Sequence, residues 1–155
     1  MIEWDLLDEK DDRVYLAYMT NRQDPFVMFE RDFGQMMDRA FKEIHEGYTH
    51  LWAMKRVGVI LPNKICYFPD NELLIEPSVY AGAPKKEVYI IFLFSKNSPS
   101  SPFMYAKGLN SGFYSSFESA AETGARLLNL MANTYPEREF KVLCTKLLYD
   151  FLWHR

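Results

Sequence analysis

The clearest strand signal in the chain is residues 88–94, which read Val-Tyr-Ile-Ile-Phe-Leu-Phe. Seven consecutive apolar or aromatic residues predict a strand that is covered on both faces and lies inside a sheet. Shorter runs of β-branched, aromatic or alternating residues predict further strands. These runs lie at residues 2–6, 14–19, 26–29, 49–61, 65–68, 72–75, 103–106 and 140–144. The polar residues 8–12 predict a hairpin turn between the first two runs.

Two segments have the spacing of three and four residues between apolar positions that is typical of an amphipathic helix. They are residues 31–46 and residues 117–133. Ser115 or Ser116 is expected to cap the second helix, and Glu118 lies at capping-box spacing from Ser115. Because each apolar helix face needs a sheet face to cover, the sequence predicts an α+β fold. We expect one mostly antiparallel sheet of about six to eight strands with two main helices.

The length of 155 residues, 48% of them apolar, predicts a single domain over residues 1–155. No uninterrupted run of about 18 apolar residues exists, so no membrane span is expected. The first residues lack the basic and then apolar order of a signal peptide. Cys66 and Cys144 stand alone in apolar, strand-like surroundings, which favours buried free thiols acting as small hydrophobes. Together these features predict a cytoplasmic protein.

The many aromatic side chains and the apolar residues near the end of the chain predict self-association. The chain has 12 Phe, 10 Tyr and 3 Trp residues, and ten tyrosine hydroxyls need partners or water. Residues 147–153 are mostly apolar and must dock against another surface. Two helices do not obviously cover so much apolar surface, so we expect a homodimer.

No catalytic, metal or cofactor motif is present in the sequence. The three histidines, His45, His50 and His154, lack metal-ligand spacing, and no phosphate-binding glycine loop occurs. The pairs Pro69-Asp70 and Glu139-Phe140-Lys141 contain the residue types of a magnesium-dependent nuclease. They lie about seventy residues apart, however, where such enzymes usually have a short hairpin. We therefore expect a protein that is not an enzyme and has no cofactor.

Acidic residues gather near the start of the chain, although the net charge is only −3. Residues 1–49 hold twelve acidic and six basic side chains. The densest group is Asp8, Glu9, Asp11 and Asp12, in the expected turn. Such a group is either a solvated turn or a docking surface for a basic protein partner. We take it as the candidate partner-binding site.

A nucleic-acid-binding module is the alternative, because exposed aromatic residues of a sheet can stack on bases beside a basic rim. The residues that would serve are Lys55, Arg56, Lys64, Tyr80, Lys85 and Lys86. The acidic first third of the chain would repel phosphate, and no Lys/Arg-Gly-Phe signature appears. Nucleic acid is thus the less favoured partner.

Residues 113–121 read Phe-Tyr-Ser-Ser-Phe-Glu-Ser-Ala-Ala, and residues 136–143, after the expected helix, read Pro-Glu-Arg-Glu-Phe-Lys-Val-Leu. This part of the chain, roughly a quarter of it, resembles small accessory proteins of bacteriophages. Those proteins often have a tyrosine before a Ser-Phe-Glu-x-Ala helix start, and a proline before the next strand. The resemblance implies a small intracellular protein that binds a host or phage macromolecule, and it implies no catalytic residue.

Overall fold

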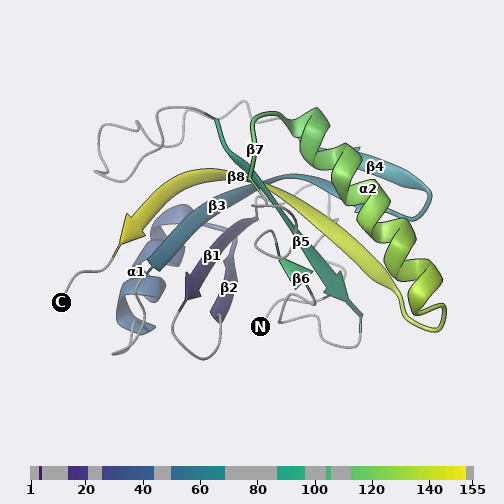
Figure 1. Ribbon diagram of the computed structural model, residues 1–155. Helices are drawn as coiled ribbons and strands as arrows, with labels where there is room; N and C mark the ends of the chain where they lie inside the picture. The colour runs from purple at the N-terminus through teal and green to yellow at the C-terminus, as the bar shows by residue number, and fades with distance from the viewer. Residues whose placement is uncertain are drawn as a thin grey trace.

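The computed structural model describes Trp4 and residues 14–20, 26–43, 50–68, 87–96, 104–105 and 113–152. This part of the chain contains eight strands and two helices (Figure 1). The strands are β1 (Tyr15–Thr20), β2 (Phe26–Glu30), β3 (His50–Leu61), β4 (Lys64–Tyr67), β5 (Tyr89–Ser95), β6 (Met104–Tyr105), β7 (Phe113–Tyr114) and β8 (Phe140–Leu152). The helices are α1 (Phe33–Glu43) and α2 (Phe117–Thr134).

The described strands form one antiparallel sheet. Its order is β2-β1-β3-β8-β5-β6, while β4 pairs with β3 and β7 pairs with β5. In Figure 1, α1 lies beside β1 and β2 on the left and α2 lies over β8 on the right. The expected α+β class, with an antiparallel sheet and two helices, is confirmed.

Strand β5 is an interior strand, as expected from its apolar run. Residues 90–94 are all fully buried, since alternate side chains enter two different core clusters. The central pair of the sheet, however, is β3 and β8, which are paired from His50↔Leu152 to Ile60↔Val142. Only the two-residue strands β6 and β7 pair with the other edge of β5 within the described residues.

The end of the chain is part of the sheet. We expected a strand at residues 140–144 and a separate apolar tail, whereas β8 is one strand of thirteen residues. The register shifts between the pairs Ala53↔Tyr149 and Met54↔Leu147, which leaves one extra residue in β8. Leu147 and Tyr149 are both buried, and they belong to core clusters on opposite faces of the sheet. Within the described side chains, Leu147 and Tyr149 of the expected tail are therefore covered by the chain itself.

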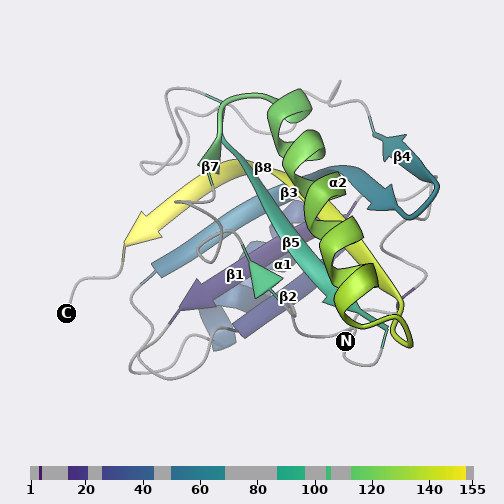
Figure 2. The same ribbon diagram turned by 45° about the vertical axis from the view of Figure 1, so that its right-hand side comes forward.

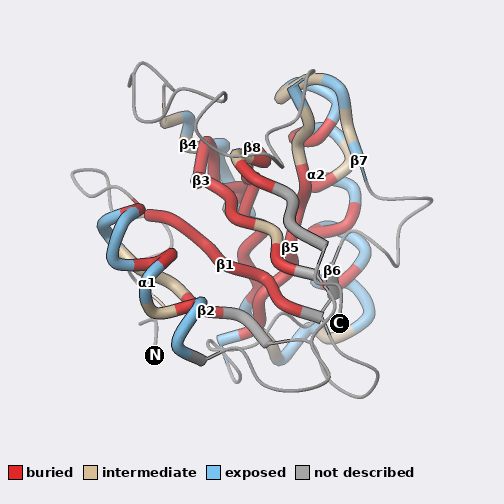
Figure 3. The backbone as a smooth tube through the Cα atoms, turned by 90° about the vertical axis from the view of Figure 1, so that its left-hand side faces the viewer, coloured by how far each residue is buried: buried red, intermediate tan, exposed pale blue. Residues whose placement is uncertain are grey.

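Both helices pack on the same face of the sheet, which we call the helix face. Leu51 and Ala53 of β3 belong to the core cluster under α1, and Val57 and Ile60 belong to the cluster under α2. A second register shift, between Arg56 and Gly58, accounts for the change in alternation along β3. Figure 2 shows α2 running alongside β5 and β8. In Figure 3 the buried strands lie between the helices, whose exposed sides face outward.

Aromatic side chains fill the opposite face, which we call the inner face. The rings of Phe29 in β2 and Phe94 in β5 are 5.6 Å apart, although three strands separate β2 from β5 in the sheet order. The ring centres of Tyr18 in β1 and Phe92 in β5 are 5.7 Å apart. Strands so distant in the order can touch only if the sheet curls, so the inner face is the inside of a strongly curved sheet.

Side chains at the two helix starts act as caps. The Asp32 carboxylate accepts a hydrogen bond of 2.8 Å from the Gln35 amide at the start of α1. The Ser116 hydroxyl accepts one of 3.2 Å from the Ser119 amide at the start of α2. Ser116 is therefore the N-cap, and the alternative with a Ser115 capping box is wrong.

Gly58 lies at the β3 bulge, where another backbone and an aromatic ring come close. A Cβ atom at Gly58 would lie 2.5 Å from the Phe117 ring and 3.2 Å from the Cys66 carbonyl oxygen. These close approaches explain why residue 58, inside a strand, is a glycine.

Some of the strands and loops expected from the sequence differ from the structure or lie outside the described residues. Trp4 lies in a 3-10 turn, not in the expected strand at residues 2–6. Residues 64–67 pair with β3 across the turn at Pro62-Asn63, and residues 72–75 lie outside the described residues. Most of the expected loop at residues 95–102 also lies outside them, although Ser95 ends β5. No described helix has the length and apolar content to cross a membrane.

The two thiols differ in burial. Cys144 is fully buried, as expected, whereas Cys66 is half-buried. Burial raises the pKa of the Cys144 thiol from 9.0 to about 12, because an ionised thiolate would lose its hydration there. The unfolded chain therefore loses this proton near pH 9 while the folded chain keeps it. The stability that this difference provides is complete below pH 9 and is lost as the pH rises toward 12.

We expect a thiol reagent at pH 8 to modify Cys66 in the folded protein and Cys144 only after unfolding. We also expect the unfolding free energy of Cys144→Ala to fall less steeply than that of the wild type between pH 9 and 11. Mass spectrometry of the modified protein and denaturant titrations measure the two effects. Equal modification rates for both cysteines in the folded protein would contradict the burial of Cys144.

Candidate functional site

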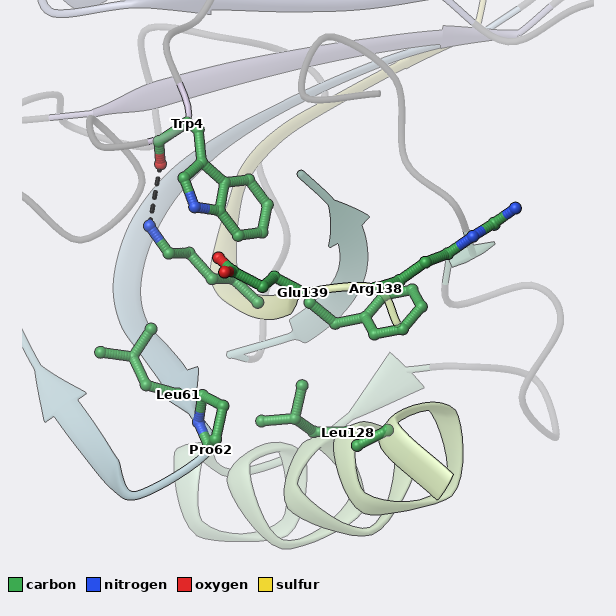
Figure 4. Close-up of a pocket in the computed structure, with 9 residues that line it drawn as sticks. Trp4, Leu61, Pro62, Leu128, Arg138 and Glu139 are labelled. Carbon is green, nitrogen blue, oxygen red and sulfur yellow. Dashed lines mark hydrogen bonds between the residues drawn. The ribbon is translucent and has the colours of Figure 1, made fainter. Parts of the chain in front are cut away.

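A pocket of about 190 Å³ opens where α2 returns into β8, and we call it the end pocket (Figure 4). Its walls come from the end of β3 and the turn after it, the last turns of α2, the α2–β8 connection, the start of β8, and Trp4. The lining residues are Trp4, Leu61, Pro62, Leu128, Ala132, Arg138, Glu139, Phe140 and Lys141. Six of these nine side chains are apolar, so the pocket suits an apolar group.

Lys141 and Trp4 form one wall of the end pocket. The Lys141 ammonium donates a hydrogen bond of 3.0 Å to the Trp4 carbonyl oxygen and lies 4.4 Å from the centre of a Trp4 ring. Figure 4 shows this bond above the pocket. Lys141 is only 8% exposed, so a cation–π contact here is partly shielded from water. The interaction holds Trp4 against the start of β8.

The rim of the end pocket also carries Arg138 and Glu139. The Arg138 guanidinium lies 5.0 Å from the centre of the Tyr135 ring, and in Figure 4 it extends away from Leu61 and Pro62. The Glu139 carboxylate lies 3.6 Å from the Lys96 ammonium. Both partners of this ion pair are more than half exposed, so the pair contributes little to stability. The Glu139 carboxylate is thus exposed at the rim.

The size of the end pocket limits what it can hold. Pockets for metabolites and cofactors usually have volumes of about 300–1,000 Å³. A cavity of about 150 Å³ is enough for benzene. The end pocket, at about 190 Å³, therefore fits one aromatic or branched aliphatic side chain better than a whole cofactor.

Lys55 and Arg56, which we expected on an exposed basic rim, are buried at 5% and 3% exposure. They lie in the middle of β3, where β1 and β8 pair with both of its edges. The Arg56 guanidinium packs over the Phe68 ring at 3.8 Å. Their placement on the rim was therefore wrong, because the strand that carries them is central to the sheet.

Lys55 belongs instead to a polar row across the helix face. Its cross-strand neighbour on β8 is Lys146, which pairs in turn with Tyr89 on β5. The Glu87 carboxylate lies 3.4 Å from the Lys146 ammonium and accepts a hydrogen bond of 3.0 Å from the Tyr89 hydroxyl. Two like charges opposite each other are unfavourable in a sheet, and Glu87 offsets part of that cost.

Of the remaining predicted site residues, the structure describes only Lys64. Lys64 is exposed on β4. Tyr80, Lys85 and Lys86 lie outside the described residues, and so does the acidic group of Asp8, Glu9, Asp11 and Asp12. Among the described residues, no three His, Cys, Asp or Glu side chains gather as a metal site. Asp70, of the nuclease-like pair, also lies outside them.

Sequence reasoning did not find the end pocket. Glu139 and Lys141 belong to the nuclease-like fragment, Arg138 belongs to the stretch that resembles bacteriophage proteins, and Trp4 belongs to the strand expected at residues 2–6, but none of these patterns indicates a pocket. The pocket joins four separate parts of the chain, which only the fold brings together. The chain matches no family model, no curated protein and no solved structure.

Proposed function

We propose that the protein is a small accessory factor that acts by binding a partner protein rather than by catalysing a reaction. The end pocket supports this proposal, because it fits a single apolar side chain and is small for a metabolite. Protein interfaces are commonly anchored by one large side chain that enters such a pocket. The resemblance of residues 113–143 to bacteriophage accessory proteins favours a phage or mobile-element origin and a host or phage protein as the partner.

The alternative of a nucleic-acid-binding module has less support. Two of its six candidate residues, Lys55 and Arg56, are buried in the sheet. The net charge of the chain is −3, which does not favour phosphate. The acidic group of Asp8, Glu9, Asp11 and Asp12 stays a second candidate surface for a protein partner.

A substitution that fills the end pocket tests the proposal. Ala132 lines the pocket and is exposed, so Ala132→Trp places a large side chain in it without entering the core. We expect this variant to capture at least tenfold less partner from a host lysate than the wild type does. Asn133→Trp is the matched control, because Asn133 is the next exposed residue of α2 and does not line the pocket.

The measurement is affinity capture with quantitative mass spectrometry, with and without nuclease treatment. A protein captured by the wild type and by Asn133→Trp, but lost with Ala132→Trp, would support the proposal. Capture that is insensitive to Ala132→Trp would contradict the use of the pocket. If it is lost instead when Asp8, Glu9, Asp11 and Asp12 are changed to Ser, the acidic group is the binding surface. Nuclease-sensitive capture would favour the nucleic-acid alternative.

A further inference from the structure

We infer that Lys141 is a positioning residue for the end pocket, because it holds Trp4 in place as the wall against which the partner's anchor packs. The inference rests on the proposed function and adds how the pocket keeps the shape that binds. Its consequence is that the docking of Trp4 on the sheet and the filling of the pocket strengthen each other.

Eight of the nine lining residues belong to elements that pack directly on one another. They come from residues 61–62, 128–132 and 138–141, in β3 and the turn after it, α2, the α2–β8 connection and β8. The strands β3 and β8 are paired as far as Ile60↔Val142, and α2 shares a core cluster with both strands. Trp4 is the ninth, and residues 5–13 separate it from Val14, the next described residue. Its place therefore depends on its own contacts.

Lys141 holds Trp4 at two points. The Lys141 ammonium donates its hydrogen bond of 3.0 Å to the Trp4 carbonyl oxygen, which fixes the backbone, and lies 4.4 Å from a ring centre of Trp4, which fixes the ring. Since Lys141 is only 8% exposed, water competes little with either contact. Trp4 also packs against the apolar cluster of the inner face. Apolar packing has no preferred direction, so the two Lys141 contacts set the orientation of the ring.

A ligand in the end pocket contacts the Trp4 ring only while Trp4 is docked. Its binding therefore favours the docked state, and by linkage the docked state favours the ligand by the same factor. If the Lys141 contacts are removed, the docked fraction of Trp4 falls and the apparent affinity of the pocket falls with it. The partner's anchor would then bind tightly only to molecules in which Trp4 is in place.

Lys141→Met tests the inference with benzene as a neutral probe of the pocket. Methionine keeps an apolar stem and removes the ammonium, so as a lining residue it should bind benzene at least as well as lysine does. We expect benzene to bind about three- to tenfold more weakly instead, because fewer molecules have Trp4 docked. The titration is followed by NMR through the amide signals of Leu128 and Ala132.

Two further variants control this titration. Lys141→Arg retains a cation and hydrogen-bond donors, so it should keep most of the wild-type affinity for benzene. Arg138→Met removes a different cation of the same pocket, one whose guanidinium lies over the Tyr135 ring. It should leave the affinity for benzene unchanged, because the Lys141 contacts with Trp4 remain.

Fluorine NMR of the protein labelled with fluorotryptophan reports on Trp4 directly, and Trp4→Phe assigns its signal. We expect Lys141→Met to shift the Trp4 signal and saturating benzene to return it toward the wild-type position, because the ligand favours the docked state. Trp52 is the internal reference, since its ring stacks on Tyr18 and it does not line the pocket. An unchanged Trp52 signal in Lys141→Met shows that the sheet is intact.

The outcomes separate this inference from the proposed function. Unchanged or tighter benzene binding by Lys141→Met would show that the coupling is wrong, while the pocket still binds an apolar group. If Lys141→Met does not fold, Trp4→Ala removes the same contacts from the other side, and wild-type affinity for benzene in that variant would contradict the inference. A wild type that binds no benzene would overturn the inference and leave the proposed function with the acidic group as its candidate surface. Weaker binding by Lys141→Met, with a Trp4 signal that benzene restores, would support both.

Discussion

Replacing Phe92 with alanine is expected to lower the free energy of unfolding by about 3–5 kcal/mol. Phe92 is fully buried on the inner face, where its ring lies 5.7 Å from that of Tyr18 and 6.5 Å from that of Phe94. The curled sheet holds strands on both sides of this ring, so it cannot easily close the cavity that alanine would leave. Denaturant titration, followed by circular dichroism, measures the loss.

Phe113→Ala is the matched control for Phe92→Ala. Phe113 also lies on a strand, β7, and contacts the Trp52 ring at 5.4 Å, but it is 49% exposed. Its removal should cost about 1 kcal/mol, because little buried surface is lost. If the two variants were destabilised equally, the inner face would not be the tightly packed core described above.

Replacing Gly124 with alanine is expected to destabilise the protein by about 1–2 kcal/mol, although alanine is the better helix former. A Cβ atom at Gly124 would lie 2.5 Å from Ile60 Cδ1 and 2.9 Å from Val142 Cγ1. The Ile60 side chain can turn away at its end, but Val142 is buried and β-branched and has little rotamer freedom. Overpacking of about 1–3 kcal/mol should therefore exceed the gain in helix propensity of about 1 kcal/mol.

A glycine-to-alanine substitution in α1 should instead stabilise the protein. Gly34 of α1 is exposed, and the nearest atom to an added Cβ is Asp32 Oδ1 at 3.3 Å. Gly34→Ala should raise the free energy of unfolding by at most about 0.5 kcal/mol, since the gain in helix propensity exceeds the cost of a small shift of the Asp32 carboxylate that caps α1. Denaturant titrations of both variants compare the two helices. A stabilising Gly124→Ala would show that α2 packs on the sheet less closely than the structure indicates.

Local patterns in the sequence were enough to place most of the elements. The apolar spacing of three and four residues located α1 and α2, because a helix that packs on a sheet needs one continuous apolar side. The run at residues 88–94 predicted β5 and its burial, because side chains on both faces of a covered strand must be apolar. An isolated glycine within an apolar strand run, such as Gly58, indicates a bulge or a close backbone approach, and the structure has both.

Charged residues inside strands misled the prediction. The sequence predicts that Lys55 and Arg56 lie on an exposed rim, since cations are rarely buried. They are buried because β1 and β8 flank this part of β3, which is a property of the sheet order. Thr145 and Lys146 interrupt the apolar pattern, so the sequence does not predict that β8 continues past residue 144. The Thr145 hydroxyl is satisfied by the Ile90 carbonyl oxygen at 2.8 Å, a bond between strands that no local pattern shows.

The sequence by itself determined the α+β class, the two helices and the most buried strand, because these depend on periodicity within a few neighbouring residues. Only the tertiary structure decided the curl of the sheet, the continuity of β8 and the end pocket. Each of these depends on contacts between distant segments, such as Phe29 with Phe94 or Trp4 with Lys141. The candidate site belongs to this second group, because its walls become neighbours only when α2 folds back onto the sheet.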